Sequence, residues 1–157
     1  MRQRYSAGSD LIRPARLEEL DEIACLWKAS WDTIGITIAA DLALPELKAR
    51  LREQVPAHWD LYVYEYEARI VGMLALVPAD NVLSEVFVAP DQQGQGIGKV
   101  LMAFAREKMP TEIHLSTAAN NHRAAAWYVR EGFELTRTRI HEEMGREMLD
   151  FTWRPKP

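Results

Sequence analysis

The sequence has few of the features that mark secreted, metal-binding or membrane proteins. It contains one cysteine, Cys25, so no internal disulfide can form, and we expect a reducing compartment and a cytoplasmic protein. No apolar run approaches the roughly 20 residues of a membrane helix, and residues 1–10 lack the apolar core of a signal peptide. The four histidines are scattered, which predicts no metal site. We therefore expect neither a membrane partner nor a bound metal.

A surplus of positive charge is also missing. The chain has 19 Lys and Arg against 23 Asp and Glu, whereas nucleic-acid-binding proteins usually carry a basic surplus, so we expect no nucleic-acid partner. Of the 157 residues, 48% are hydrophobic, which excludes disorder and supplies the core of one domain. We expect residues 1–9 to be a loose N-terminal tail and residues 10–157 to form that single domain.

Apolar spacing predicts strands and helices in the order β-α-α-β-β-β-α-β-α-β-β, which is an α+β layered domain with a mixed sheet. Alternating and β-branched segments predict strands at 11–13, 61–66, 69–77, 82–88, 113–117, 133–140 and 148–153. Apolar residues every three or four positions predict helices at 17–31, 45–55, 98–109 and 121–131. The segment 34–44 is ambiguous, and Gly35 favours a loop there.

Three glycines at alternate positions, Gly94, Gly96 and Gly98, separate an expected strand from an expected helix. Amides of glycines and of a helix N-terminus can approach an anion closely, so this loop predicts a phosphate or pyrophosphate site. It is not a Walker motif, because Gln93 stands at the first glycine position and Val100 at the hydroxyl position. Its spacing also differs from the G-x-G-x-x-G of Rossmann folds. The alternative is a plain glycine-rich turn.

Two motifs occur in order in the second half of the chain. The first is Gln93-x-x-Gly96-x-Gly98, after a strand that ends Val88-Ala89-Pro90. The second is Asn121-x-x-Ala124-x-x-Trp127-Tyr128-x-x-x-Gly132-Phe133. Together they resemble the two hallmark motifs of the GNAT N-acetyltransferase superfamily, with Trp127 where Phe is more usual. The resemblance implies a mixed, mostly antiparallel sheet of about seven strands with helices on both faces. It also implies that residues 10–157 form an acetyltransferase domain.

The resemblance implies acetyl-CoA as the acetyl donor and assigns residues to it. Backbone groups of the strand would hold the pantetheine arm, the glycine loop would receive the pyrophosphate, and Asn121 would contact the arm or cap its helix. Tyr128 would hydrogen-bond the thioester sulfur and protonate the thiolate. The expected cofactor-binding residues are Val86, Phe87, Val88, Gln93, Gly94, Gln95, Gly96, Ile97, Gly98, Lys99, Asn121 and Tyr128.

Catalysis would be a direct attack of an amine on the thioester in a ternary complex. A phenol with a pKa of about 10 stays protonated at neutral pH, so Tyr128 suits a general acid, although a core tyrosine is the alternative. An alkylamine must lose a proton before it attacks, and Glu85, or a water that it holds, is the candidate base. His114 and His141 are alternative bases, because an unperturbed imidazole titrates near pH 6.5.

The resemblance places the acceptor between the first helices and the last strands. Trp27, Trp31 and His141 are the candidate acceptor-binding residues, with core packing as the alternative for Trp27. We expect a small-molecule amine as acceptor, with a protein N-terminus or lysine as the alternative. A non-catalytic acyl-CoA-binding regulatory module is the alternative from another class of protein. A homodimer stays open, since dimers are common among proteins of this kind.

Overall fold

The computed structural model describes residues 11–34, 43–142 and 145–157. The expected tail at 1–9 lies outside these residues, as does most of the expected loop at 34–44. The strands are β1 (Ile12–Pro14), β2 (Asp60–Tyr66), β3 (Arg69–Val77), β4 (Val82–Val88), β5 (Ile113–Ala118), β6 (Glu134–Ile140) and β7 (Glu147–Trp153). The helices are α1 (Leu20–Asp32), α2 (Leu44–Gln54), α3 (Ile97–Lys108) and α4 (His122–Arg130). The predicted order of elements is confirmed.

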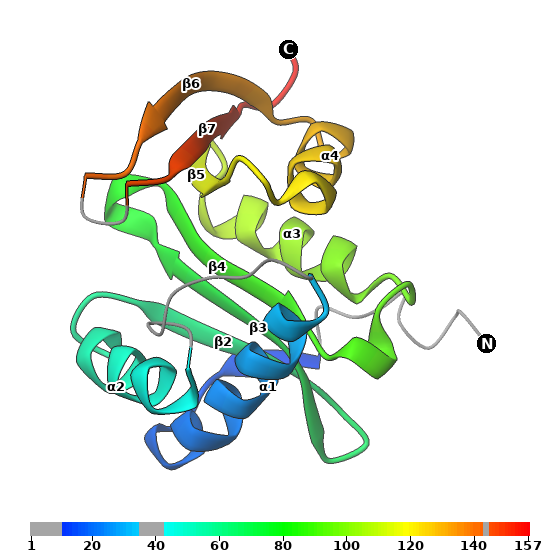
Figure 1. The fold of residues 1–157 in the computed structure, drawn as a ribbon. Coiled ribbons are helices and arrows are strands. Elements are labelled where there is room, and N and C mark those ends of the chain that lie inside the picture. The colour runs from blue at the N-terminus through cyan, green and yellow to red at the C-terminus, as the bar shows by residue number, and fades with distance from the viewer. Residues whose placement is uncertain (1–10, 35–42, 143–144) are drawn as a thin grey trace.

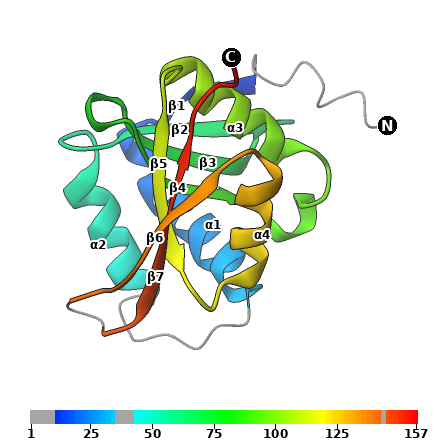
Figure 2. The same cartoon turned by 90° about the horizontal axis from the view of Figure 1, so that it is seen from above.

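These strands form one seven-stranded sheet in the order β1-β2-β3-β4-β5-β7-β6 (Figures 1 and 2). Every neighbouring pair is antiparallel except β4 and β5, so the expected mixed and mostly antiparallel sheet is confirmed. Pro14 lies in β1, at the edge of the sheet, where a residue without an amide hydrogen is tolerated.

The helices cover opposite faces of the sheet, as cross-strand pairs show. Met73 pairs with Phe87, and the Phe87 ring lies 5.7 Å from that of Trp27, so this face packs on α1. The next position along β3 is Gly72, where an added Cβ would lie 3.2 Å from Leu101, so the opposite face packs on α3. Successive strand residues point to opposite faces, which places α1 and α3 on either side. The expectation of helices on both faces is confirmed.

The sheet opens between β4 and β5, and this opening positions the site. The two strands pair only at Val82 and His114 and part beyond that point. On its other side β4 stays paired with β3, but Ala75 lies opposite Glu85 and Leu76 opposite Leu83, which leaves Ser84 as the extra residue of a bulge. Beyond the bulge the pairing is regular, and Glu85 shares its face with Phe87 because the two residues are two positions apart. Glu85 therefore lies on the face that carries α1.

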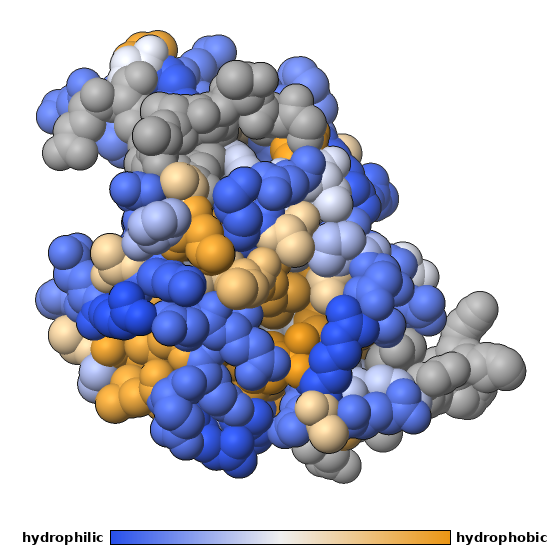
Figure 3. Space-filling view, turned by 60° about the horizontal axis from the view of Figure 1, so that its bottom comes forward, coloured by the Kyte–Doolittle hydropathy of each residue, from blue (hydrophilic) through white to orange (hydrophobic). Residues whose placement is uncertain are grey.

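The surface over α1 and α2 is largely hydrophilic, with apolar patches between charged side chains (Figure 3). In the part of the chain that the structure describes, no helix has the length and apolarity needed to span a membrane.

Candidate active site

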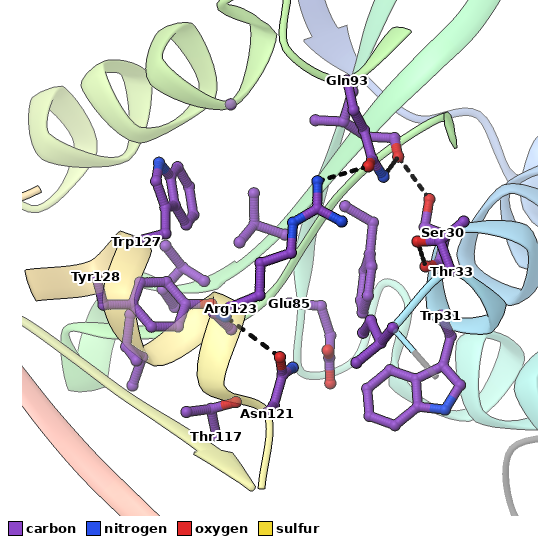
Figure 4. A pocket seen from close by; sticks show the side chains of 18 of the residues that line it. Ser30, Trp31, Thr33, Glu85, Gln93, Thr117, Asn121, Arg123, Trp127 and Tyr128 are labelled. Carbon is purple, nitrogen blue, oxygen red and sulfur yellow. Dashed lines mark hydrogen bonds between the residues drawn. The ribbon is translucent and has the colours of Figure 1, made fainter. Parts of the chain in front are cut away.

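A cavity of about 960 Å³ lies where β4 and β5 part. Its wall comes from β4 and β5, from α1 and α2, from the loop before α3, from α4, and from the start of β7. Figure 4 shows Trp31, Ser30 and Thr33 on one side of it, Trp127, Tyr128 and Asn121 on the other, and Glu85 between them. Segments far apart in the sequence thus line one cavity.

The glycine loop closes one end of this cavity. Gly94 and Gly96 have φ of +78° and +90°, a left-handed conformation that other residues rarely adopt, and Gly96 is the N-cap of α3. Gly98 is needed for another reason, because a Cβ there would lie 3.2 Å from the Trp127 ring of α4. The loop therefore turns the N-terminal amides of α3 toward the cavity and lets α4 pack close beside them. Such an end of a helix can bind an anion.

Polar groups gather where β4 ends. The carbonyl oxygen of Val88 accepts hydrogen bonds from Ser30 Oγ at 2.6 Å and from Gln93 Nε2 at 3.0 Å. The Oε1 atom of Gln93 in turn accepts from Arg123 of α4 at 3.0 Å. Gln93 therefore links the β4 side to the α4 side (Figure 4). These contacts hold the glycine loop against both sides.

Tyr128 is buried on the α4 side and also lines the cavity. Its ring packs against those of Trp127, Phe133 and Phe151, with centroids 5.3 to 5.9 Å apart. Burial raises the pKa of Tyr128 above its usual value, and the charge of Glu85 raises it further. The phenol therefore stays protonated at any physiological pH and can donate a hydrogen bond into the cavity.

Glu85 faces Tyr128 from β4. Desolvation raises the pKa of its carboxyl group from 4.5 to about 7, and the positive charge of Arg50 on α2 opposes that rise. A carboxyl group that titrates near pH 7 can accept a proton and release it under the same conditions. Tyr128 and Glu85 thus supply a donor and an acceptor of protons in one cavity.

Asn121 caps α4, since its side chain accepts a hydrogen bond from the Ala124 amide at 3.2 Å. It also lines the cavity, so capping does not exclude a contact with a ligand. Most of the predicted site residues line this one cavity: Trp27, Trp31, Glu85, Val86, Phe87, Val88, Gln93, Gly94, Gly96, Ile97, Gly98, Lys99, Asn121 and Tyr128.

Three candidates lie outside the cavity wall. Gln95 is exposed at the tip of the glycine loop, and His141 belongs to the turn before β7, whose Arg146 lines the cavity instead. His114 bonds Thr152 and Glu112 beside the point where β4 and β5 still pair. Their positions give no support to the acceptor role of His141 or to either histidine as the base. Trp27 lines the wall but is 2% exposed and packs on Trp59 and Phe87, as its core alternative predicts.

Several lining residues had no signal in the sequence. Ser30, Arg50 and Arg146 come from the first helices and from the last turn, where no motif singles them out. Arg123 and Arg130 lie on α4 at positions that an ordinary solvated helix face would also fill with arginine. Only the tertiary structure brings these side chains to the site. Among the described residues, no cluster of His, Cys, Asp and Glu could hold a metal ion.

Fold and cavity together define an α+β domain with a large cavity where two parallel strands part. The model of the acetyltransferase (GNAT) domain matches residues 57–135, about half of the chain. The chain belongs to this family, as the two motifs predict, and it is an acetyltransferase.

Relatives agree in sequence and in fold. The chain is 27% identical over 146 residues to the peptidyl-lysine N-acetyltransferase YjaB of Escherichia coli. The alignment covers 93% of this chain and 91% of the relative. The solution structure of the apo form of that protein superimposes with a TM-score of 0.76 and covers 90% of this chain and 95% of its own. The PaiA N-acetyltransferase of Thermoplasma acidophilum, solved with coenzyme A, has the same fold at 18% identity, with a TM-score of 0.72 and coverage of 92% and 98%.

Proposed function

We propose that the chain transfers the acetyl group of acetyl-CoA to an amine by direct attack in a ternary complex, with residues 10–157 as the single catalytic domain. One observation carries this proposal: the amides of the glycine loop and the pair Tyr128 and Glu85 open into the same cavity. The pyrophosphate would lie at the N-terminus of α3, and the pantetheine arm along the edge of β4 that β5 leaves unpaired. The thioester would then lie between Tyr128 and Glu85. The complex of a structural neighbour with coenzyme A supports this choice of cofactor.

In the proposed reaction the neutral amine nitrogen attacks the thioester carbonyl carbon, and the carbon–sulfur bond breaks. The proton of the amine passes to Glu85, directly or through water, and the electron pair leaves with the CoA thiolate. The Tyr128 hydroxyl donates a hydrogen bond to that sulfur. Because the pKa of the phenol is raised, stabilising the thiolate by a hydrogen bond is easier than complete proton transfer. Such positioned groups each contribute about 10²–10⁴ to the rate.

A small-molecule amine is our first choice of acceptor, because side chains of α1, α2 and the start of β7 line the cavity on the side of Glu85 away from Tyr128. A specific observation favours a second candidate: relatives along most of the chain are named peptidyl-lysine N-acetyltransferases. For a protein acceptor, the lysine side chain would enter the cavity and its backbone would stay outside.

The test is CoA release from acetyl-CoA in the presence of amino acids, diamines and lysine peptides, with the products identified by mass spectrometry. We expect at least one amine to accelerate CoA release and to gain one acetyl group. If acetyl-CoA does not bind to the protein, the proposed function is wrong.

A further inference from the structure

Among the residues that the structure describes, those that line the cavity are mainly cationic, although the chain has a net charge of −4. Its lining includes the carboxylates of Glu85 and Glu131, and against them the cations Arg50, Lys99, Arg123, Arg130 and Arg146. An anionic cofactor would meet those cations that lie on its own side of the cavity. The cations divide into two groups by the elements that carry them.

The first group lies on the glycine loop and α4. Lys99 is 3.2 Å from Glu131, Arg123 bonds Gln93, and Arg130 is the last residue of α4. All three are on the side where we place the pyrophosphate. The second group, Arg50 of α2 and Arg146 just before β7, comes from elements that form the other part of the wall (Figure 1, left side of the molecule). Both lie outside the segment 57–135 that the family shares.

Arg50 and Arg146 have no counter-ion within hydrogen-bond distance among residues 11–34, 43–142 and 145–157. Arg50 is half-buried, and its positive charge acts on Glu85 without a hydrogen bond between them. Arg146 is half-buried too, and its Nε atom is wholly buried without a hydrogen-bond acceptor.

The backbone holds Arg146 in place. Its carbonyl oxygen accepts from the His141 amide at 2.8 Å, and the next carbonyl, that of Glu147, accepts from the Ala119 amide at 2.9 Å. The backbone at Arg146 is therefore held beside the end of β5. A buried guanidinium nitrogen without an acceptor is costly unless a ligand supplies one.

We propose that the acetyl acceptor is an amine that also carries a carboxylate, which Arg50 and Arg146 bind while the amine nitrogen meets Glu85. This inference rests on the proposed function and names the acceptor class for the same site. The planar fork of a guanidinium matches a carboxylate, and a diamine of the same length would bring a second cation against two arginines. The carboxylate belongs either to a free amino acid or to an acidic residue beside a lysine in a peptide.

The competing explanation is that Arg50 only adjusts the protonation of Glu85. That role would change the pH dependence equally for every amine and would not distinguish a carboxylate from a methyl group. A comparison of matched acceptors separates the two explanations.

The experiment measures kcat/KM for pairs that differ only in the carboxylate: 6-aminohexanoate and hexylamine, 4-aminobutyrate and butylamine, and lysine and cadaverine. The second arm uses peptides whose N-terminus is blocked by acetylation and whose free lysine lies next to Asp or next to Asn. We expect the carboxylate member of at least one pair to be preferred by about tenfold to a hundredfold, which is the size of charge-assisted hydrogen bonds. The arm that shows the preference identifies the source of the carboxylate.

In Arg50→Gln and in Arg146→Gln, the ratio of kcat/KM between the two members of a pair should fall toward one. We expect this change mainly in the KM for the carboxylate member. The control is Arg52→Gln, since Arg52 lies on the same helix, pairs with Asp21 and does not line the cavity. That variant should keep the wild-type preference. Equal rates for both members of every pair would overturn the proposal, as would a preference that survives in both arginine variants. If acetyl-CoA binds but no amine of the panel releases CoA, the acceptor class is wrong, whereas failure to bind acetyl-CoA contradicts the proposed function itself.

Discussion

At the scale of single residues, Tyr128 and Glu85 both have raised pKa values because both side chains are desolvated. Burial raises the pKa of both groups, and the negative charge of Glu85 raises that of Tyr128 further. The consequence is a division of tasks: the phenol keeps its proton, and the carboxyl group exchanges one near pH 7. Neither property belongs to the residue type alone.

Replacing Tyr128 by phenylalanine tests the proposed hydrogen bond to the thiolate. Tyr128→Phe keeps the ring that packs on Phe133 and Phe151, so we expect acetyl-CoA to bind as before and kcat to fall by about 10² or more. Steady-state kinetics and calorimetric titration check the two parts. The control is Tyr62→Phe, a tyrosine of β2 that packs on Phe104 away from the cavity. An unchanged kcat in Tyr128→Phe would remove the hydroxyl from the reaction.

Replacing Glu85 by glutamine tests the base and its pH dependence. In the wild type we expect kcat/KM to rise with pH around a midpoint near 7, as the carboxyl group loses its proton. In Glu85→Gln this rise with pH should disappear and the rate should fall by about 10²-fold. Glu134 lies on the exposed edge strand, so Glu134→Gln should keep the pH dependence and the rate of the wild type. A rise with pH that survives in Glu85→Gln would exclude Glu85 as the base.

Stability should respond in the opposite direction to activity. The folded pKa of Glu85, about 7, lies above the unfolded value of 4.5, so between these pH values the unfolded state binds fewer protons. Stability from this group is therefore complete below pH 4.5 and is lost as the pH rises through about 7. Urea denaturation should show Glu85→Gln gaining stability relative to the wild type between pH 5 and 8. A constant difference would mean that the carboxyl group is not buried enough to shift.

Sequence patterns could place Tyr128 and Asn121 together but could not place the residues that surround them in the cavity. Tyr128 and Asn121 belong to one motif on one helix, so spacing alone places them together. Ser30, Arg50 and Arg146 reach the cavity from separate elements, and their positions depend on the packing of α1, α2 and the turn before β7. Local sequence patterns do not predict such long-range contacts.

At the scale of elements, the approach of α4 to the N-terminus of α3 determines the shape of the pyrophosphate end. Gly98 is the contact point, because its missing side chain gives room to the Trp127 ring. Gly98→Val should therefore displace Trp127 or the first turn of α3, and we expect the affinity for acetyl-CoA to fall by about tenfold to a hundredfold. Calorimetry measures this directly. Ala103→Val, on the exposed face of the same helix, is the matched control, and equal losses in both variants would mean that the effect is on helix stability only.

The order of elements was predictable because periodicity of two and of 3.6 residues is a local property. Two features of the sheet were not. The bulge at Ser84 depends on how β4 pairs with β3. The separation of β4 from β5 depends on the elements that pack beside the opening. These two features turn Glu85 toward α1 and leave an edge of β4 open.

At the scale of the whole molecule, an acidic chain has a cationic cavity. If an anionic cofactor binds there, it should stabilise the fold by about 2.7 kcal/mol at one hundred times its dissociation constant, since only the folded state has the cavity. For a domain of this size that corresponds to about 5–10 °C in Tm. Thermal unfolding with acetyl-CoA measures the shift. Pantetheine, which lacks the pyrophosphate, should give a clearly smaller one, and equal shifts would contradict the assignment of the glycine loop.

The central claim is that acetyl-CoA lies in the cavity between β4 and β5, with its thioester between Tyr128 and Glu85. A crystal structure of the protein with CoA tests this most directly. We expect the pyrophosphate on the amides of residues 94–99, the pantetheine arm along β4, and the thiol within hydrogen-bond distance of the Tyr128 hydroxyl. A CoA molecule bound elsewhere, or bound here with its thiol directed away from Tyr128, would contradict it.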